Sequence, residues 1–575
     1  MYTLGIHSGY HDACAALYRD YELVAAVALE RMTRRKIDGG RIPDEAIAEC
    51  LGIAGITAQD VSAVALSRGA FPSRYFKHFP LPRLVENRVR EMVGLEKNKS
   101  MERECVRYGR TDSINMFDAA GFLRDAGLRP DTKLHFYNHH CSHALGTLFH
   151  TDWDEALIYT ADGGGDNVQY SHRILRDGKL ETLYGGDDGL LQPMRIDSLG
   201  LAYGYATQAL GFRINKHEGK LTGLAALGEP AIAQALASHF SVDDDGRVSS
   251  DFDSYPAMRR WVFAWAEGHP REVVAASVQK VLEDFILLAV GRLLKKHGLR
   301  KLGLSGGVFA NVKLNQRLAE ELPVDEVFIY PAMSDQGLAA GGALDYLLAR
   351  DGLQTWLSKR YRFPHLYLGR DYTADIDPIL ANGGAALVHA DSVRGDPVQT
   401  AAELLHDGKI VAIYAKGMEH GPRALGARTI MAAPLRNEIN QTLNDRLERS
   451  EFMPFAPVVR DVDATRVFDL LPQSLYAARF MTITCQVRDE WRMRIPAVVH
   501  VDRTARPQVI EREPNPLYYD ILTAYAERSG VPVLVNTSFN VHEEPIINTP
   551  AECLRALVEG RIDYVVTESA VWKKA

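Results

Sequence analysis

Cysteine is scarce in this sequence, with 6 among 575 residues, and no two of them form a C-x-x-C pair. A disulfide framework and a structural zinc site are therefore not expected, and a reducing compartment is the natural interpretation. Long apolar runs are missing too, because Phe285–Val290 is far shorter than the roughly 20 residues of a membrane span. The opening MYTLGIHSGYHDA shows no charged leader before an apolar stretch. We expect a cytoplasmic protein with no membrane partner.

Extended Lys/Arg tracts are absent as well, and the formal net charge is −8. Nucleic acid is therefore disfavoured as a partner. The sequence has no G-x-x-x-x-G-K-[ST] motif, which excludes a P-loop of the Walker A type. Glycine, in contrast, is frequent, and its 46 residues favour tight turns and close approach of the backbone to ligands.

The patterns that are present alternate between strand and helix, which predicts an α/β protein. Residues 3–7, 13–18 and 22–28 are expected as strands, and a polar turn joins the first two. A second strand–turn–strand unit follows at 156–175, with its glycine-rich turn expected at 161–166. Two hairpins whose turns can face a phosphate are typical of the actin, hexokinase and chaperone-ATPase superfamily.

The chain is long enough for at least two domains. The pattern resets near residue 355, where the polar segment Ser358–Arg362 suits a linker. We therefore expect domains at 1–355 and 356–575. The polar stretch 70–111, rich in Arg and Glu, is expected to be a helical insertion in the first domain.

Two histidines stand one helical turn apart in His139–His143, provided that this segment starts a helix. Imidazoles at that spacing can share one metal ion. Asp162 at a strand end and Asp335 at a strand-to-helix turn would complete a mixed nitrogen and oxygen site for Fe(II), Zn or a similar ion. A helix start with polar residues, next to ordinary turns, is the plainer interpretation and stays open at this point.

Several glycine-containing segments can bring their backbone close to phosphate groups. Glycines follow Asp162, and Ser305–Gly307 leads from a strand into a helix whose first amides could bind a nucleotide. The expected nucleotide-binding residues are Gly163, Gly164, Lys220, Gly306, Gly307 and Asn311. Plain turns and ordinary surface lysines are the alternative interpretation.

The densest signal is the segment Gly417–Arg428, in which Arg423 and Arg428 stand beside glycines after a buried strand. Arginine forks match phosphate and carbamate oxygens through paired hydrogen bonds. Donor-rich strand ends at 500–506 and 536–540 add further partners. Together they predict an anion site in the second domain, formed by Lys416, Arg423, Arg428, Thr504, Arg506, Asn536, Thr537, Ser538 and Asn540. Arg449 is added to this set only by the family resemblance given below.

The ordered set of motifs resembles the O-carbamoyltransferases of nodulation-factor, cephalosporin and aminoglycoside biosynthesis (NodU/CmcH type). The motifs that carry the resemblance are His139–His143, Asp162–Gly164, Glu218–Ala225, Ser305–Val308, Asp335, Gly421–Gly426, Pro454–Pro457, His500–Arg506 and Asn536–Asn540. The resemblance implies an actin-like (ASKHA) first domain and a YrdC-like α/β second domain. It further implies a metal held by His139, His143, Asp162 and Asp335, and carbamoyl phosphate bound near Arg423 and Arg428.

The activity implied by the resemblance is ATP-dependent O-carbamoyl transfer through carbamoyl-adenylate to a hydroxyl of a small molecule, such as an antibiotic precursor. The implied cofactor is Fe(II) or a similar divalent ion. ATP, together with Mg²⁺, is the implied co-substrate. His11 is expected to take the proton of the hydroxyl because an imidazole titrates near neutral pH, and Asp12 is expected to orient it. The sequence does not define the acceptor or the oligomeric state, and a homodimer is kept as an expectation.

Two other functions fit parts of the sequence. An actin-like metabolite kinase would share the glycine hairpins and ATP, but it would not need the segment Gly421–Gly426 or a second domain. A tRNA-directed protein like the threonylcarbamoyl machinery is disfavoured by the acidic net charge and by the fused second domain.

Overall fold

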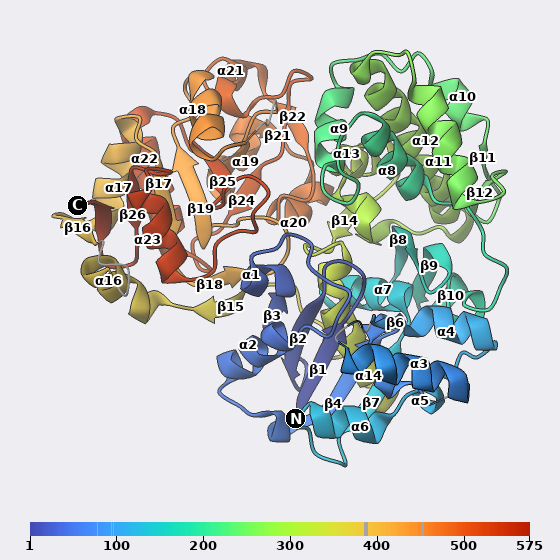
Figure 1. The fold of residues 1–575 in the computed structure, drawn as a ribbon. Coiled ribbons are helices and arrows are strands. Elements are labelled where there is room, and N and C mark those ends of the chain that lie inside the picture. Colours follow the sequence, from blue (N-terminus) through green and yellow to red (C-terminus); the bar gives the residue numbers. More distant parts are fainter. Residues whose placement is uncertain (78, 94, 96, 384–388, 450–452) are drawn as a thin grey trace. The chain divides into compact units, whose positions relative to one another are not determined.

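The computed structural model describes residues 1–77, 79–93, 95, 97–383, 389–449 and 453–575. The chain divides into two compact units. The first consists of Met1–Thr33, Ile37–Arg317 and Glu321–Arg362, and the second of Arg34–Lys36, Leu318–Glu320 and Phe363–Ala575. Each unit has its own sheets and helices (Figure 1).

The first unit contains two five-stranded sheets with the same strand order. In each sheet the first three strands form antiparallel pairs, and two later strands add in parallel beside the first. The strands of the first sheet, in spatial order, are β3 (Glu22–Ala28), β2 (Cys14–Arg19), β1 (Tyr2–His7), β4 (Val61–Ser67) and β7 (Lys133–Tyr137). Those of the second are β10 (Lys179–Tyr184), β9 (Val168–Arg176), β8 (Ala156–Gly165), β13 (Lys301–Ser305) and β14 (Glu326–Ile329).

This repeated topology confirms the predicted duplicated, actin-like first domain and its α/β class. One detail differs from the prediction, because β8 continues through all three glycines to Gly165. The hairpin turns at Asp166 and Asn167 instead, with φ values of 48° and 65°. Two consecutive positive φ angles make the tight two-residue turn that matches the twist of flanking strands, and Asp and Asn accept it.

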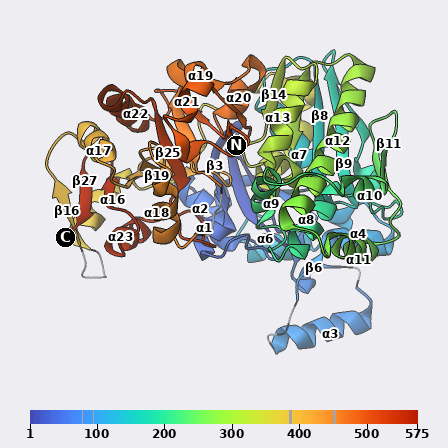
Figure 2. The ribbon, with the colours of Figure 1, turned by 90° about the horizontal axis from the view of Figure 1, so that it is seen from above.

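Helices cover these sheets and connect their strands (Figure 2). They are α1 (Leu29–Thr33), α2 (Asp44–Ala54), α3 (Leu81–Met92), α4 (Met101–Tyr108), α5 (Ser113–Met116), α6 (Ala119–Asp125), α7 (His139–Phe149), α8 (Leu199–Ala209), α9 (Glu218–Ala225), α10 (Ala233–Ala237), α11 (Tyr255–Ala266), α12 (Arg271–His297), α13 (Val312–Glu321), α14 (Leu338–Asp351) and α15 (Leu353–Leu357). Short strand pairs are β5 (Ala70–Phe71) with β6 (Lys99–Ser100), and β11 (Phe240–Val242) with β12 (Val248–Ser250). In the described part of 70–111, α3 and α4 bear out the expected helical insertion.

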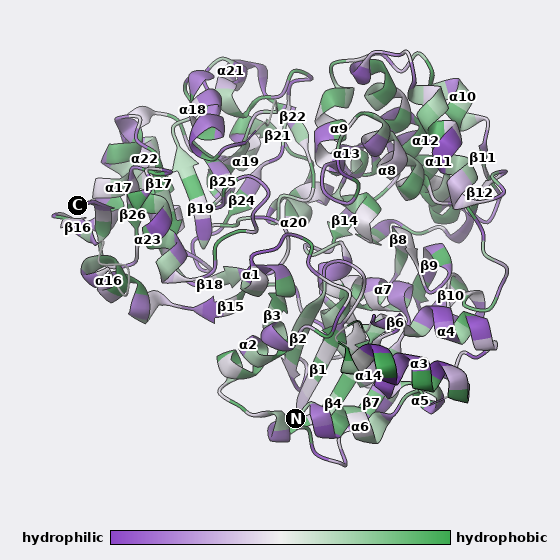
Figure 3. Ribbon diagram, viewed as in Figure 1, coloured by the Kyte–Doolittle hydropathy of each residue, from purple (hydrophilic) through white to green (hydrophobic). Residues whose placement is uncertain are grey.

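Helix α14 packs against both strand β1 and helix α7 through glycines. A β-carbon added at Gly5 would lie 1.8 Å from the carbonyl oxygen of Ala339 in α14. One added at Gly341 would lie 2.0 Å from the carbonyl oxygen of Ser142 in α7. Only residues without a side chain allow this approach. Strand β4 beside β1 is drawn mostly in the hydrophobic colour (Figure 3), and the side chains of Val64 and Leu66 are fully buried.

The second unit is a mixed α/β structure around an eight-stranded sheet. In spatial order its strands are β16 (Ala390–Val393), β27 (Val571–Lys574), β26 (Tyr564–Val566), β17 (Val411–Tyr414), β19 (Arg428–Ala432), β25 (Val533–Ser538), β20 (Ala456–Arg460) and β24 (Gln508–Ile510). Smaller sheets pair β15 (Tyr367–Asp371) with β18 (Gly417–Glu419), and β22 (Cys485–Val487) with β21 (Phe468–Asp469) and β23 (Thr504–Ala505). The helices are α16 (Thr373–Asn382), α17 (Pro397–His406), α18 (Glu438–Arg446), α19 (Asp461–Val467), α20 (Leu475–Ala478), α21 (Asp489–Arg492), α22 (Pro516–Ser529) and α23 (Pro550–Val558).

No helix in the described segments has both the length and the apolar character needed to cross a membrane.

Candidate metal centre and arginine site

Four side chains of the first unit form a cluster suited to a metal ion. His139 and His143 lie on the first turns of α7, whose N-cap Asn138 accepts a hydrogen bond from the amide of Cys141. Asp162 lies near the end of β8, and Asp335 begins the turn that leads into α14. One ligand atom from each of the four residues lies within 4.8 Å of the others. The helical spacing, the strand end and the strand-to-helix turn therefore bring together the four residues that the sequence singled out.

The imidazole and carboxylate atoms of this cluster face one another. The Nε2 atom of His143 lies 3.3 Å from Oδ2 of Asp162, and Nε2 of His139 lies 3.7 Å from Oδ1 of Asp335. Both Nε2 atoms are buried and make no hydrogen bond within the described residues. Unpaired buried donors are costly, so this arrangement is typical of a site that holds an ion. Two imidazole nitrogens and two carboxylate oxygens suit a divalent transition metal.

The charges of the cluster reinforce each other. Burial lowers the pKa of His139, but the Asp335 and Asp162 carboxylates outweigh it and raise that pKa to about 9. Burial raises the pKa of Asp335, but His139, His11 and His7 hold it far below its usual range. The pKa of Asp162 is likewise lowered, because the neighbouring imidazoles of His139 and His143 overcome its burial. Both carboxylates are thus ionised and available as metal ligands.

Backbone amides hold Asp162 in place. Its Oδ1 atom accepts a hydrogen bond from the amide of Gly163 at 2.5 Å, and Oδ2 accepts one from Gly307 at 2.9 Å. The second imidazole nitrogen of His143 lies 3.1 Å from Oγ of Ser305. Fixing the ligands through outer contacts of this kind orients them for a metal. Two amides expected to meet a nucleotide therefore serve the Asp162 carboxylate in this structure.

The other expected nucleotide-binding residues surround the same region of the first unit. Gly306 has a φ of 104°, and a β-carbon there would lie 2.1 Å from the carbonyl oxygen of Ala161. Asn311 caps α13 and also donates to the side chain of Gln279 at 2.8 Å. Lys220 is buried within α9, and Gly164 adopts a φ of 152° in β8. Their role toward a nucleotide stays a prediction.

The expected base, His11, lies beside the metal cluster. Its Nδ1 atom lies 3.2 Å from Oδ2 of Asp12 and 3.9 Å from Oδ2 of Asp335. Burial lowers the pKa of His11, but Asp335 and Asp12 raise it to about 10. Gln336 donates a hydrogen bond to Oδ1 of Asp12 at 3.2 Å. The structure therefore brings His11 and Asp12 together with the metal cluster, and their catalytic roles stay predictions.

Sequence reasoning missed several residues of this site. His7 lies at the end of β1, with Nε2 3.2 Å from Oδ2 of Asp335. Asp166 accepts a hydrogen bond from the amide of His139 at 2.7 Å and forms a buried ion pair with Arg68 at 3.0 Å. Asp166 thereby holds the start of α7. The signal available for His7 was its position, four residues before His11 in the same hairpin.

In the second unit, the carboxylate of Glu419 organises the segment around Arg423 and Arg428. The Oε1 atom of Glu419 accepts the amides of Leu425, Ala427 and Arg428 at 2.9, 2.8 and 3.0 Å. Glu419 is 2% exposed. Three amides converging on one oxygen fix the backbone before β19.

The two arginines of this segment differ in their surroundings. Nη1 of Arg428 donates to the carbonyl oxygens of Ala415 and Lys416 at 2.8 and 3.2 Å, and its guanidinium carbon lies 3.7 Å from the ring centre of Tyr414. Its Nε and Nη2 atoms are buried without a hydrogen-bond partner among the described residues, as is Nε of Arg423. Burial lowers the pKa of Arg423 to about 10, with no carboxylate nearby to oppose it. Unpaired buried guanidinium donors suit an anionic ligand.

The remaining predicted anion-binding residues fall into separate groups. Arg449 donates to Oγ1 of Thr537 and to the side chains of Ser538 and Asn540 at 2.7, 3.1 and 2.7 Å, so these four residues do meet. Asn536 lies next to the arginine segment and donates to the carbonyl oxygen of Ala424 at 3.0 Å. Two others form contacts of their own: Lys416 pairs with Glu568 at 2.7 Å, and Thr504 donates to Asp502 at 2.6 Å. Arg506 is partly buried, and its role stays a prediction.

Two family models and several known proteins match this chain. Residues 2–344 match the family model described as Carbamoyltransferase N-terminus, and residues 402–574 match Carbamoyltransferase C-terminus. The chain is 30% identical to the uncharacterized protein sll1178 of Synechocystis sp., over 100% of this chain and 97% of that protein. It is also 30% identical to the nodulation protein NolNO of Sinorhizobium fredii, over 98% of this chain and 79% of that protein. Full-length HypF in its phosphate- and nucleotide-bound form aligns with a TM-score of 0.33 at 13% identity, over 61% of this chain and 56% of that chain.

Proposed function

Because the chain belongs to the carbamoyltransferase family, we propose that it transfers a carbamoyl group from carbamoyl phosphate to a hydroxyl of a small molecule, with ATP consumed through carbamoyl-adenylate. The observation that carries the proposal is the combination of a four-donor metal cluster in one unit with unpaired buried arginine donors in the other. We further propose that residues 1–355 and 356–575 form the two functional domains.

The second unit supplies the first half of this reaction. Arg423 and Arg428 bind the phosphate of carbamoyl phosphate, because their unpaired guanidinium donors fit its oxygens. Hydrolysis releases phosphate and carbamate, and a carbamate oxygen then attacks the α-phosphorus of ATP. The new P–O bond replaces the bond to pyrophosphate and gives carbamoyl-adenylate. Carbamate is short-lived in water, so enclosure in a buried site protects it.

The first unit supplies the second half. The acceptor hydroxyl attacks the carbamoyl carbon and AMP leaves. His11, whose ring Asp12 holds, takes the hydroxyl proton in the fraction of molecules where its imidazole is neutral. That fraction is small at pH 7, because the Asp335 and Asp12 carboxylates raise the pKa of His11 to about 10. Among the described residues His139, His143, Asp162 and Asp335 would hold the divalent ion. When bound, this ion neutralises phosphate charge and helps to position the nucleotide. Gly163, Gly164, Lys220, Gly306, Gly307 and Asn311 are the proposed nucleotide contacts.

A product assay tests the proposal. The purified protein is incubated with ATP and carbamoyl phosphate, and the mixture is analysed by mass spectrometry and for pyrophosphate. We expect carbamoyl-AMP and pyrophosphate, both dependent on carbamoyl phosphate, followed by AMP when an acceptor alcohol is added. Formation of ADP in place of AMP would instead identify a kinase and refute the proposal.

A further inference from the structure

The segment Leu425–Arg428 is held on both sides of its backbone. On the amide side, Leu425, Ala427 and Arg428 donate to the same carboxylate oxygen of Glu419. The remaining amide, that of Gly426, donates to Oγ1 of Thr429 at 3.0 Å. Each of these four N–H groups therefore has a side-chain acceptor.

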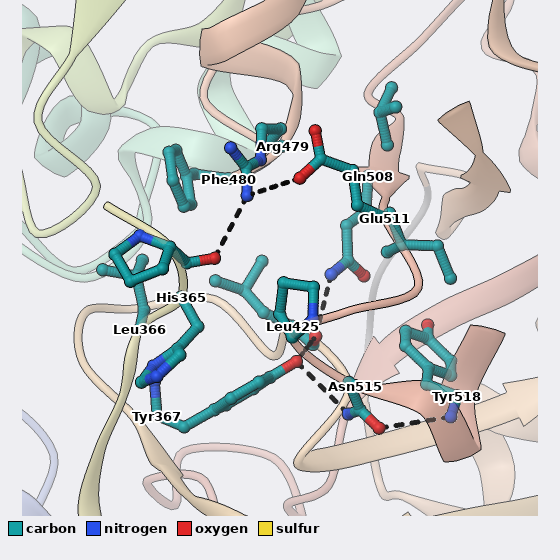
Figure 4. A pocket seen from close by; sticks show the side chains of 14 residues that line it. His365, Leu366, Tyr367, Leu425, Arg479, Phe480, Gln508, Glu511, Asn515 and Tyr518 are labelled. Atoms are coloured by element: carbon teal, nitrogen blue, oxygen red, sulfur yellow. Dashed lines mark hydrogen bonds and ion pairs between the residues drawn. The ribbon is translucent and has the colours of Figure 1, made fainter. Parts of the chain in front are cut away.

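The carbonyl oxygens of the same segment are bound by side chains from other elements. Leu425 accepts hydrogen bonds from Nε2 of Gln508 at 2.8 Å and from the hydroxyl of Tyr367 at 3.0 Å. Gly426 accepts one from Nδ2 of Asn515 at 3.0 Å. Figure 4 shows Tyr367, Gln508 and Asn515 converging on this turn from different parts of the second unit. The backbone at this turn therefore has very little freedom to adjust.

One glycine before the segment and one within it give the backbone its course. Gly421 and Gly426 have φ values of 100° and 108°, which residues with a β-carbon rarely adopt. A β-carbon at Gly426 would lie 2.3 Å from the ring of Tyr518. Between these glycines stands Arg423, whose buried guanidinium lacks a carboxylate partner, and after them comes Arg428.

We propose that Glu419 is a positioning residue, which sets the backbone from Leu425 to Arg428 so that Arg423 and Arg428 present their free donors to carbamoyl phosphate. This inference rests on the proposed function. Glu419 acts through the amides, because its Oε1 atom accepts all three N–H groups and its Oε2 atom is buried. Preorganised donors bind an anion without paying for reorganisation at the moment of binding.

The charge of Glu419 matters as much as its shape. Hydrogen bonds to an ionised acceptor are roughly twice as strong as those between neutral groups. Glu419→Gln keeps an acceptor oxygen but removes the charge and buries an amide NH₂ at the position of Oε2, which has no hydrogen-bond partner within the described residues. The segment should then sample other conformations, and the two arginines should bind less tightly.

Isothermal titration with carbamoyl phosphate, and with inorganic phosphate as a second probe, tests the inference on the full chain. For Glu419→Gln we expect the dissociation constant for carbamoyl phosphate to rise about tenfold, with the metal content and the KM for ATP unchanged. The matched control is Glu511→Gln, which removes a carboxylate that is 47% exposed and pairs with Arg479 at 3.0 Å in the same unit. This control should bind carbamoyl phosphate like the wild type.

The outcomes separate the two proposals. If the wild-type protein binds neither probe, the proposed function fails and the role of Glu419 falls with it. If the wild type binds and Glu419→Gln binds equally well, only the inference about Glu419 is refuted. Glu419→Ala, which leaves three amides without an acceptor, should bind still more weakly; should it fail to fold, Glu419→Gln alone decides.

Discussion

The Nε2 atom of His143 lies 3.3 Å from Oδ2 of Asp162, although one residue belongs to helix α7 and the other to strand β8. The amide of Gly307 donates a hydrogen bond to the same carboxylate oxygen. Neither contact satisfies the buried imidazole nitrogen, which has no hydrogen-bond partner among the described residues. A divalent ion would be the missing partner of this nitrogen.

Replacing His143 with Asn should remove the metal while leaving the fold intact. One donor of four is lost, so we expect the affinity for a divalent ion to fall at least about tenfold. The measurement is the ion content of purified protein by plasma mass spectrometry, together with the rise in melting temperature on adding Fe(II) or Zn(II). The control is His239→Asn, whose imidazole pairs with Asp251 at 2.7 Å outside the cluster. Equal metal content in both variants would exclude these residues as a metal site.

The metal cluster was largely predictable from sequence because each member carried a local signal. His139 and His143 needed only a helix, and Asp162 and Asp335 needed only the rule that polar residues at strand ends gather at one sheet edge. His7 and Asp166 were missed because their roles depend on contacts between segments far apart in the chain. Asp166 meets Arg68, which is 98 residues away, and no local pattern indicates such a pair.

Replacing the guanidinium group of Arg423 should weaken the binding of carbamoyl phosphate. Lysine keeps the positive charge but has no paired donors, so we expect the KM for carbamoyl phosphate to rise about 10- to 100-fold in Arg423→Lys. Steady-state kinetics of pyrophosphate release provide the measurement. Arg512→Lys serves as control, because Arg512 is exposed and pairs with Asp520 at 2.7 Å. An unchanged KM in Arg423→Lys would place the anion elsewhere.

The close contact of β1 with α14 should make Gly5 intolerant of any side chain. In Gly5→Ala the new β-carbon would lie 1.8 Å from the carbonyl oxygen of Ala339, so the helix must shift. We expect a loss of about 3 kcal/mol in the free energy of unfolding, measured by urea denaturation. For comparison, Gly219→Ala in α9 meets no atom within 4 Å and should gain up to about 1 kcal/mol. A Gly5→Ala protein of normal stability would contradict this packing.

His172 should make the protein sensitive to acid. Burial, with help from Arg247 and Arg173, lowers its pKa to about 3, and neither ring nitrogen has a hydrogen-bond partner within the described segments. The unfolded chain takes up this proton near pH 6.5 and the folded chain does not. The contribution of neutral His172 to the free energy of unfolding is therefore fully present above pH 6.5. It is lost as the pH falls below 6.5, by up to about 1.4 kcal/mol per pH unit.

Phenylalanine at position 172 keeps the ring, which stacks on Tyr159 at a distance of 4.8 Å, and removes the titration. We expect the unfolding free energy of His172→Phe to fall less steeply than that of the wild type between pH 6.5 and 5, as measured by urea denaturation. Parallel curves for His172→Phe and wild type would show that His172 is already protonated in the folded state.

The fold was predictable to the level of the two hairpins and the α/β class, since alternating strands and glycine-containing turns define both. The position of the second turn was not. Three consecutive glycines indicated a turn at 161–166, but Asp166 and Asn167 accept positive φ angles and make the turn themselves. Glu419 was also missed, because a carboxylate that binds backbone amides gives no spacing or charge pattern that a sequence displays.

The repeated sheets give the metal cluster a mechanical meaning. Helix α7 follows the last strand of the first sheet, Asp162 belongs to the first strand of the second, and Asp335 leads into the helix that rests on β1. A coordinated ion would therefore connect the two halves of the repeat. A rotation of one half against the other would separate the ligands of the ion. Binding of the ion would then be coupled to holding the two halves together. Amides near both hairpins should therefore exchange more slowly with deuterium when the ion is bound.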